Sequence, residues 1–225
     1  MIDGSERSEA PPSQLPPPAD EVTMNEHLRA VIDMLGPPED RFADPSAWLR
    51  LETELGLALP SDYKKIIDSY APVIVNAHLY LNHPATEWWN LSQWMRETIT
   101  AFTDVDWDGL DLDPDEDPRE LFGLPELTFG TMAGLWPIAS TDRGEYVFLV
   151  RGPGEEDERL IVVDGDLWWA EHRVSFAEWL HRYLIGEDMT GPNSSAFYPG
   201  PVRLEHLPMA PDERPRPWFG PDRGM

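Results

Sequence analysis

The chain of 225 residues contains no cysteine. This absence excludes disulfides, zinc–thiolate sites, iron–sulfur clusters and cysteine nucleophiles, and it favours a reducing compartment, so we expect a cytoplasmic protein. Basic residues are also scarce, because 17 Lys and Arg stand against 42 Asp and Glu, giving a formal net charge of −25. A nucleic acid or an anionic membrane would repel such a chain, so we expect neither as a partner.

Long apolar runs are missing as well. No stretch approaches the ~18 consecutive apolar residues of a membrane-spanning helix. The first 20 residues have neither a basic start nor an apolar segment of about 7 to 15 residues, which argues against a secretory signal. The hydrophobic content of 41% still suffices for one core of ordinary domain size. The sequence therefore predicts a soluble, acidic protein with one domain.

Proline is concentrated towards both ends of the chain. Five of the 24 prolines fall in the first 20 residues and eight fall after residue 190. Because proline lacks the N–H that helices and sheets require, we expect a disordered tail at 1–21 and a proline-rich tail at 191–225, both dispensable for folding. The domain is then expected at 22–190. The aromatic Trp218 and Phe219 leave two alternatives for the second tail, docking on the domain, which we favour, or contact with a partner.

Helical spacing dominates the first half of the domain, and strand spacing the second. Helices are expected over 23–35, from Pro45 and from about Ser61, and again after Asn90. The run 73–81 is strand-like. Short β-branched or aromatic runs separated by turns predict an antiparallel meander, and a capping box begins a last helix. These runs are 136–139, 145–150, 159–163 and 167–170, and the capping box is Ser175 with Glu178. The fold class is therefore α+β, with a mostly antiparallel sheet of about four to six strands and helices packed on one face.

Several phrases, taken in this order, resemble the SUKH superfamily, which is named partly for a fungal cell-wall assembly regulator. The opening phrases are Trp48, Glu52 to Gly56, and Leu59-Pro60-Ser61-Asp62-Tyr63-Lys64; the later ones are Leu135 to Ala139, Gly144 to Val150, Val162-Val163-Asp164 and Ser175 to Leu180. The resemblance spans residues 40–186, with 104–117 as an apparent insertion. It implies a non-enzymatic binding fold, used in bacteria largely by immunity proteins that neutralise polymorphic toxins, often nucleases.

The densest feature of the sequence is an acidic loop at 104–117, which contains no basic residue. Carboxylates on an inhibitor can steer it to the basic substrate groove of a nuclease, so we expect a basic protein partner, such as a toxin domain. The candidate contacts are Asp104, Asp106, Asp108, Asp111, Asp113, Asp115, Glu116 and Asp117, together with a second acidic run of Glu155, Glu156, Asp157 and Glu158.

The same loop opens with the D-x-D-x-D-G spacing of a calcium-binding loop. The weak candidates for calcium ligands are Asp104, Asp106, Asp108 and Asp115. Asp115 stands where a glutamate normally binds calcium with both oxygens, and Pro118 and Gly123 argue against the helix that should follow such a loop. The favoured interpretation is thus a solvated loop or a partner contact, and a calcium-regulated or general regulatory interaction domain is the alternative.

No other pattern indicates an enzyme or a cofactor. His78 and His83 have neither the spacing of a helical zinc pair nor an H-E-x-x-H arrangement. No G-x-S-x-G elbow is present, and the glycines at 152 and 154 precede four acids that would repel a phosphate. We therefore expect no catalytic residue, no cofactor and no metal beyond the calcium alternative.

Two adjacent tryptophan pairs, Trp88-Trp89 and Trp168-Trp169, are the remaining signal. Neighbouring residues cannot both face the core of a helix or a strand. At least one member of each pair should therefore lie at the surface or beneath a loop. Packing beneath a loop or tail is the favoured interpretation, and an aromatic anchor in a protein interface is the alternative.

Overall fold

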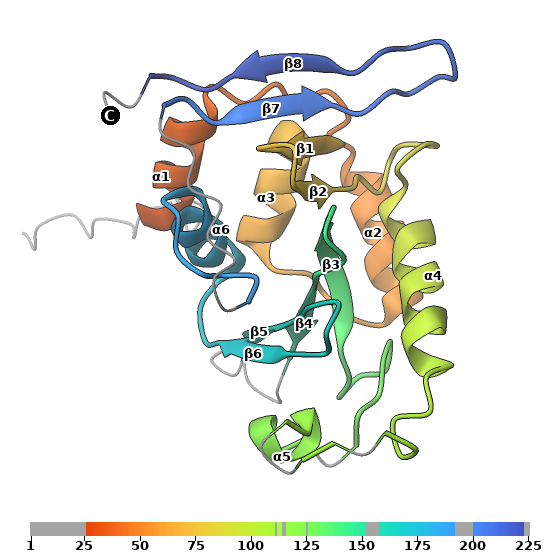
Figure 1. The fold of residues 1–225 in the computed structure, drawn as a ribbon. Coiled ribbons are helices and arrows are strands. Elements are labelled where there is room, and N and C mark those ends of the chain that lie inside the picture. The colour runs from red at the N-terminus through yellow and green to blue at the C-terminus, as the bar shows by residue number, and fades with distance from the viewer. Residues whose placement is uncertain are drawn as a thin grey trace, which may run out of the picture.

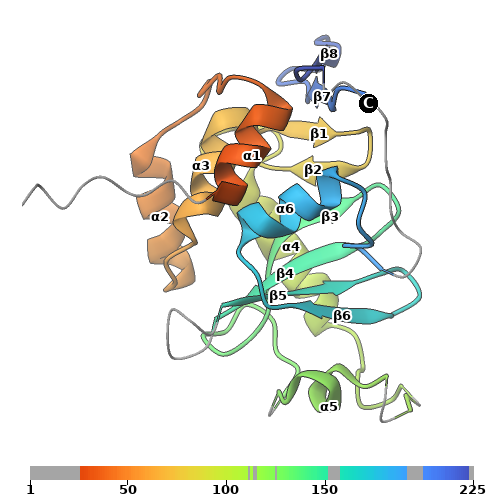
Figure 2. The same ribbon diagram turned by 90° about the vertical axis from the view of Figure 1, so that its left-hand side faces the viewer.

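The computed structural model describes residues 26–110, 112–113, 116–124, 126–151, 158–191 and 200–222. Helices pack around one antiparallel sheet, as Figures 1 and 2 show from two directions. The expected α+β class with an antiparallel sheet is confirmed.

The helices of the described residues begin where the sequence places polar caps or prolines. Asp44 accepts a hydrogen bond from Ser46 N at the start of α2, Asn90 accepts one from Gln93 N at the start of α4, and Ser175 caps α6. The bounds are α1 Glu26–Leu35, α2 Pro45–Leu55, α3 Ser61–Tyr70, α4 Leu91–Thr103, α5 Pro118–Phe122 and α6 Phe176–Leu184. None of these helices is long and apolar enough to span a membrane.

The short helix α5 was not expected. Asp117 caps it by accepting a hydrogen bond from Arg119 N, Pro118 occupies its first turn, and Gly123 ends it with a φ of 60°. Proline is favoured at the first position of a helix, where its missing N–H has no partner to lose, and glycine is favoured just past the end. The two residues that argued against a helix are therefore its boundaries.

The sheet has more strands than the four to six expected. The eight strands of the described chain are β1 Val73–Val75, β2 Leu79–Leu81, β3 Trp136–Thr141, β4 Tyr146–Val150, β5 Arg159–Val163, β6 Trp169–His172, β7 Arg203–His206 and β8 Arg216–Phe219. Their order is β6-β5-β4-β3-β2-β1-β7-β8, and every pairing is antiparallel. The strands β3 to β6 form the expected meander.

The two additional strands come from the segment that we assigned to a proline-rich tail. Strand β7 pairs with β1, and Asn76 both donates its N–H to the Arg203 carbonyl at 2.7 Å and accepts from Arg203 N through its side chain. Leu204 is fully buried. Pro217 lies in the edge strand β8, where a missing N–H costs little. The folded unit therefore includes residues 200–222, which is the docking alternative rather than a detached tail. The tail at 1–21 lies outside the described residues, and the dispensability of both tails for folding stays a prediction.

Both faces of the sheet are buried, whereas we expected helices on one face. Along β4, Val147 and Leu149 enter the core formed with α1, α2, α3 and α6, while Phe148 and Val150 enter a second core. The second core is closed by the end of α4, by α5 and by the chain between them. Figure 2 shows α4 passing behind the sheet and α6 in front of it. The acidic loop thus lies over the second face.

Candidate acidic binding site

Trp107 anchors the acidic loop to the second core. Its side chain is 9% exposed, and its indole N–H donates to the Phe102 carbonyl at 2.8 Å. Its ring lies parallel to Phe102 and meets Trp169 edge-on, with ring centroids 6.2 Å and 5.8 Å away. A buried aromatic ring of this size fixes the chain on both sides of it. The charged neighbours of Trp107 are therefore held at the surface in defined positions.

Arg119 is the single basic residue between 104 and 128. Its guanidinium donates to both carboxylate oxygens of Asp117, with the shortest contact at 2.8 Å, and to Asp108 Oδ1 at 2.5 Å. The hydrogen bonds from Arg119 lower the pKa of Asp117, and the same carboxylates raise the pKa of Arg119. Arg119 therefore ties the cap of α5 to the loop, and its guanidinium is engaged by carboxylates of this chain.

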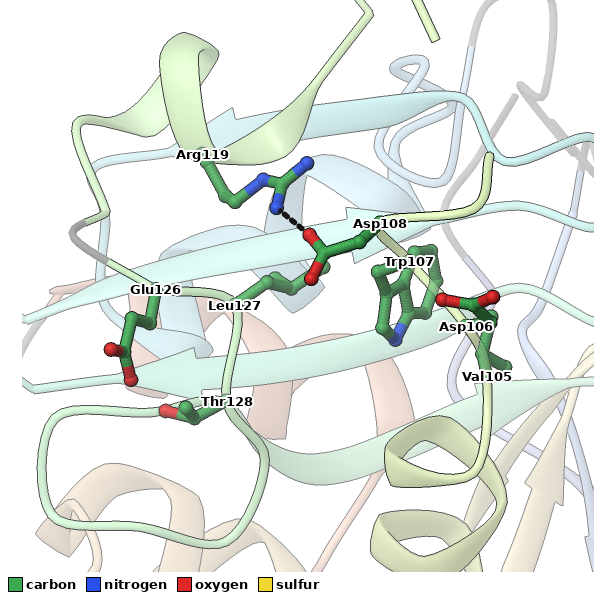
Figure 3. Close-up of a pocket in the computed structure, with 8 residues that line it drawn as sticks. All are labelled: Val105, Asp106, Trp107, Asp108, Arg119, Glu126, Leu127 and Thr128. Atoms are coloured by element: carbon green, nitrogen blue, oxygen red, sulfur yellow. Dashed lines mark hydrogen bonds and ion pairs between the residues drawn. The ribbon is translucent and has the colours of Figure 1, made fainter. Parts of the chain in front are cut away.

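The contacts of Arg119 with Asp108 and Asp117 form what we call the Arg119 clamp, and a pocket of about 370 Å³ opens beside it. Figure 3 shows the Asp108–Arg119 pair across the pocket, with Glu126 on one side and Asp106 on the other. Its lining consists of Val105, Asp106, Trp107, Asp108, Arg119, Glu126, Leu127 and Thr128. Val105, Trp107 and Leu127 in the same lining as three carboxylates suit a side chain with an aliphatic stem and a cationic end, as in lysine or arginine.

Most exposed carboxylates between Asp104 and Glu126 lack an ion pair among the described residues. The exposed ones are Asp104, Asp106, Asp108, Asp113, Glu116, Glu120 and Glu126. Within the described part of the chain, Asp108 is the one member of this set with an ion pair. Asp104 also follows the C-terminus of α4, where the helix dipole disfavours an anion. Repulsion within this surface, which we call the acidic surface, has no benefit for stability.

The described residues do not assemble the calcium site. No group of three or more acidic or histidine side chains among them is arranged to hold a metal ion. Asp108 is paired with Arg119, and Asp106 Oδ1 accepts a hydrogen bond from Gly109 N at 3.1 Å. Asp111 and Asp115 lie outside the described residues.

Of the second acidic run, Glu158 is the one residue that lies in the described part of the chain. Glu155, Glu156 and Asp157 lie outside the described residues, and the Glu158 side chain is 17% exposed and lies 3.5 Å from Arg151. The next residue, Arg159, donates to the Phe122 carbonyl at the end of α5. The start of β5 therefore lies beside the acidic surface, but Glu158 itself serves an internal ion pair.

Sequence reasoning named two of the eight residues that line the pocket, Asp106 and Asp108, and missed the other six, which are Val105, Trp107, Arg119, Glu126, Leu127 and Thr128. Glu126 lies beyond the acidic run, and its place at the pocket follows from the path of the chain rather than from a local pattern. Arg119 could have been found from the sequence, because Asp117 followed by Pro118 is typical of a capped helix start and places Arg119 in the first turn.

The tryptophan pairs follow the expectation that one member of each lies near the surface. Trp169 is buried in the second core, while Trp168 is exposed. Trp88 and Trp89 are both partly exposed, and Trp89 donates its indole N–H to the Pro208 carbonyl in the chain between β7 and β8. Trp89 thus lies beside the C-terminal segment.

Two buried histidines serve as internal links. His78 Nδ1 lies 2.7 Å from the Tyr183 hydroxyl of α6. His83 accepts from Ala85 N through Nδ1, so its Nε2 carries the proton that faces Asp68 at 3.2 Å. Burial lowers the pKa of both imidazoles. These contacts assign the two histidines to packing between elements.

Comparisons with protein-family models, curated proteins and solved structures find no match to the chain. The function therefore has to be argued from the geometry and the charge of the acidic surface. Exposed carboxylates of this kind can attract cationic groups.

Proposed function

We propose that the protein is a non-enzymatic binding module that contacts a basic protein through the acidic surface. The observation that carries the proposal is the pocket between Asp106, Asp108 and Glu126, where Val105, Trp107 and Leu127 lie beside two carboxylates, Asp106 and Glu126, that have no ion pair among the described residues, while Asp108 is paired with Arg119. A lysine or arginine of the partner would bury its stem against Val105 and Leu127 and place its charge among the carboxylates.

The arrangement favours fast association. A net charge of −25 creates a long-range attraction for a basic partner, and the carboxylates around the pocket concentrate that field at one place. Since the Arg119 clamp and Trp107 hold the loop before a partner arrives, little ordering remains to be done on binding. On this proposal the contacts of Arg119 and Trp107 order the described part of the acidic surface before a partner binds.

The resemblance of residues 40–186 to the SUKH superfamily supports the same function. It implies an immunity-type protein, and a nuclease toxin has a basic groove that carboxylates can block. On this proposal the partner is a toxin domain and the protein acts in the cytoplasm.

The test uses proteins captured by the immobilised chain from a lysate of its own cells, followed by binding kinetics with each captured protein. The site variant combines Asp104→Asn, Asp106→Asn and Glu126→Gln. The control variant removes the same charge elsewhere through Asp33→Asn, Glu87→Gln and Asp212→Asn, all exposed and without an ion pair among the described residues.

We expect the site variant to slow association at least about tenfold at low salt and to flatten its salt dependence, while the control variant changes it far less. Equal slowing in both variants would show that only the net charge matters and would refute the site. A calcium titration by calorimetry runs in parallel, and heat that disappears in the site variant would favour the calcium alternative.

A further inference from the structure

Two histidines from different helices meet at the contact between α1 and α6. His27 Nδ1 and His181 Nδ1 are 3.1 Å apart, and the ring centroids are 5.3 Å apart. Two imidazole nitrogens at this distance share one proton, since one nitrogen donates its N–H and the other accepts with its lone pair. The contact can therefore form when at least one ring is neutral, and it is lost when both rings are cations.

Among the described residues, Glu178, Arg182 and Glu187, from α6 and the chain that follows it, are charged groups that face this pair. Glu178 Oε2 lies 3.7 Å from His27 Nε2, and Arg182 donates to Glu178 at 2.6 Å and lies 3.9 Å from Glu187. One positive charge on His27 is accommodated by Glu178. A second, on His181, would lie beside both His27 and Arg182, and Glu178 already serves these two groups.

Burial and the neighbouring positive charges act together on His181. Burial is the main reason why the pKa of His181 is lowered, and His27 and Arg182 lower it further, against Glu187 and Glu178. The His27 side chain is 26% exposed, so solvent protons can reach the pair.

The pair lies at the first turn of α1, next to Leu28, which packs in the main core. Leu28, Val31 and Leu35 bury the inner face of the helix. The C-terminal end is held separately, because the Tyr70 hydroxyl donates to the Gly36 carbonyl at 2.6 Å. Loss of the histidine contact would therefore act on the first turn while the other end stays bound.

We propose that His27 and His181 form a pH-sensitive clasp, which holds the first turn of α1 on α6 at neutral pH and opens when both imidazoles are protonated. This device is independent of the acidic surface, which lies over the opposite face of the sheet. It would couple acidification to exposure of the apolar face shared by α1 and α6.

The experiment measures amide hydrogen exchange at about pH 7.5 and about pH 5.5, within the range where histidine changes its charge. Protection of the α1 amides, corrected for intrinsic exchange, is compared with that of α3 in the wild type, in His181→Gln and in the control His206→Gln. We expect acid to reduce α1 protection severalfold relative to α3 in the wild type and in the control, and to leave this ratio unchanged in His181→Gln. Equal acid loss in all three proteins, or none in the wild type, would overturn the proposal.

A second readout needs no variant. In the NMR titration of the wild-type imidazoles, the clasp requires the His27 and His181 resonances each to report the other's protonation, with His181 titrating below the ordinary histidine pKa of about 6.5. Two independent, ordinary titration curves would refute the clasp even if His181→Gln failed to fold.

Discussion

Replacing Tyr63 with phenylalanine tests how the helical layer is joined to the sheet. Strand β3 has a register shift between Pro137 and Ala139, so Ile138 has no partner residue in β4. The Tyr63 hydroxyl donates to that carbonyl at 2.9 Å, and the Tyr63 side chain is fully buried. Tyr63→Phe keeps the ring but leaves a buried carbonyl without a partner.

The expected cost follows from these contacts. An unsatisfied buried polar group costs about 1–3 kcal/mol, so Tyr63→Phe should lower the free energy of unfolding by that amount. For a chain of this length the loss corresponds to a fall in Tm of roughly 2–12 °C. Tyr63→Ala should cost about 3–5 kcal/mol, because it also removes the ring that meets Phe176 edge-on at 4.9 Å.

The assay is urea unfolding followed by tryptophan fluorescence, with the slope of the transition compared between variants. Tyr146→Phe is the matched control, since the Tyr146 hydroxyl has no hydrogen bond among the described residues, and its change should stay within about 0.5 kcal/mol. If Tyr63→Phe were as stable as the control, the hydrogen bond from the Tyr63 hydroxyl to the Ile138 carbonyl would not stabilise the fold, and the prediction would be refuted.

Three further predictions concern other parts of the fold. A Cβ on Gly220 would lie 2.1 Å from the Met34 carbonyl, so Gly220→Ala should lower stability by about 1–3 kcal/mol in thermal unfolding, whereas Gly165→Ala, whose Cβ has its nearest neighbour at 3.8 Å, should be nearly neutral. Arg119→Gln removes the clamp on the acidic loop, so limited proteolysis within 104–118 should become faster; an unchanged rate would contradict the clamp. Stability should be constant above about pH 6.5 and fall at lower pH, because burial lowers the pKa of five imidazoles and the unfolded chain then binds more protons; the histidines are His78, His83, His172, His181 and His206. Urea midpoints measured across this range should show the loss, which Glu145 opposes in part because burial raises its pKa.

Local signals in the sequence determined most of the helices and the central meander. A cap such as Asp44 or Ser175 acts on N–H groups two or three residues away, so its effect can be read from a short window. Alternation of side chains in β4 and β5 is likewise a local property, and it predicted the strands and the α+β class. The acidic loop was visible as a run of charge, while the partner and the immunity function stay predictions.

Tertiary structure decided what connects distant parts of the chain. Strand β7 is extended because Asn76 and β1, 127 residues away, offer it hydrogen-bond partners. The proline content of the segment does not reveal that the edge of β1 is free to pair with it. Asp62, in the Leu-Pro-Ser-Asp-Tyr phrase, accepts a hydrogen bond from Ala177 N at the start of α6, a contact over 115 residues. Burial of both sheet faces and the pocket at Glu126 arise in the same way. A short window records which backbone conformation a residue favours, whereas pairing and burial depend on which distant surface the folded chain brings to it.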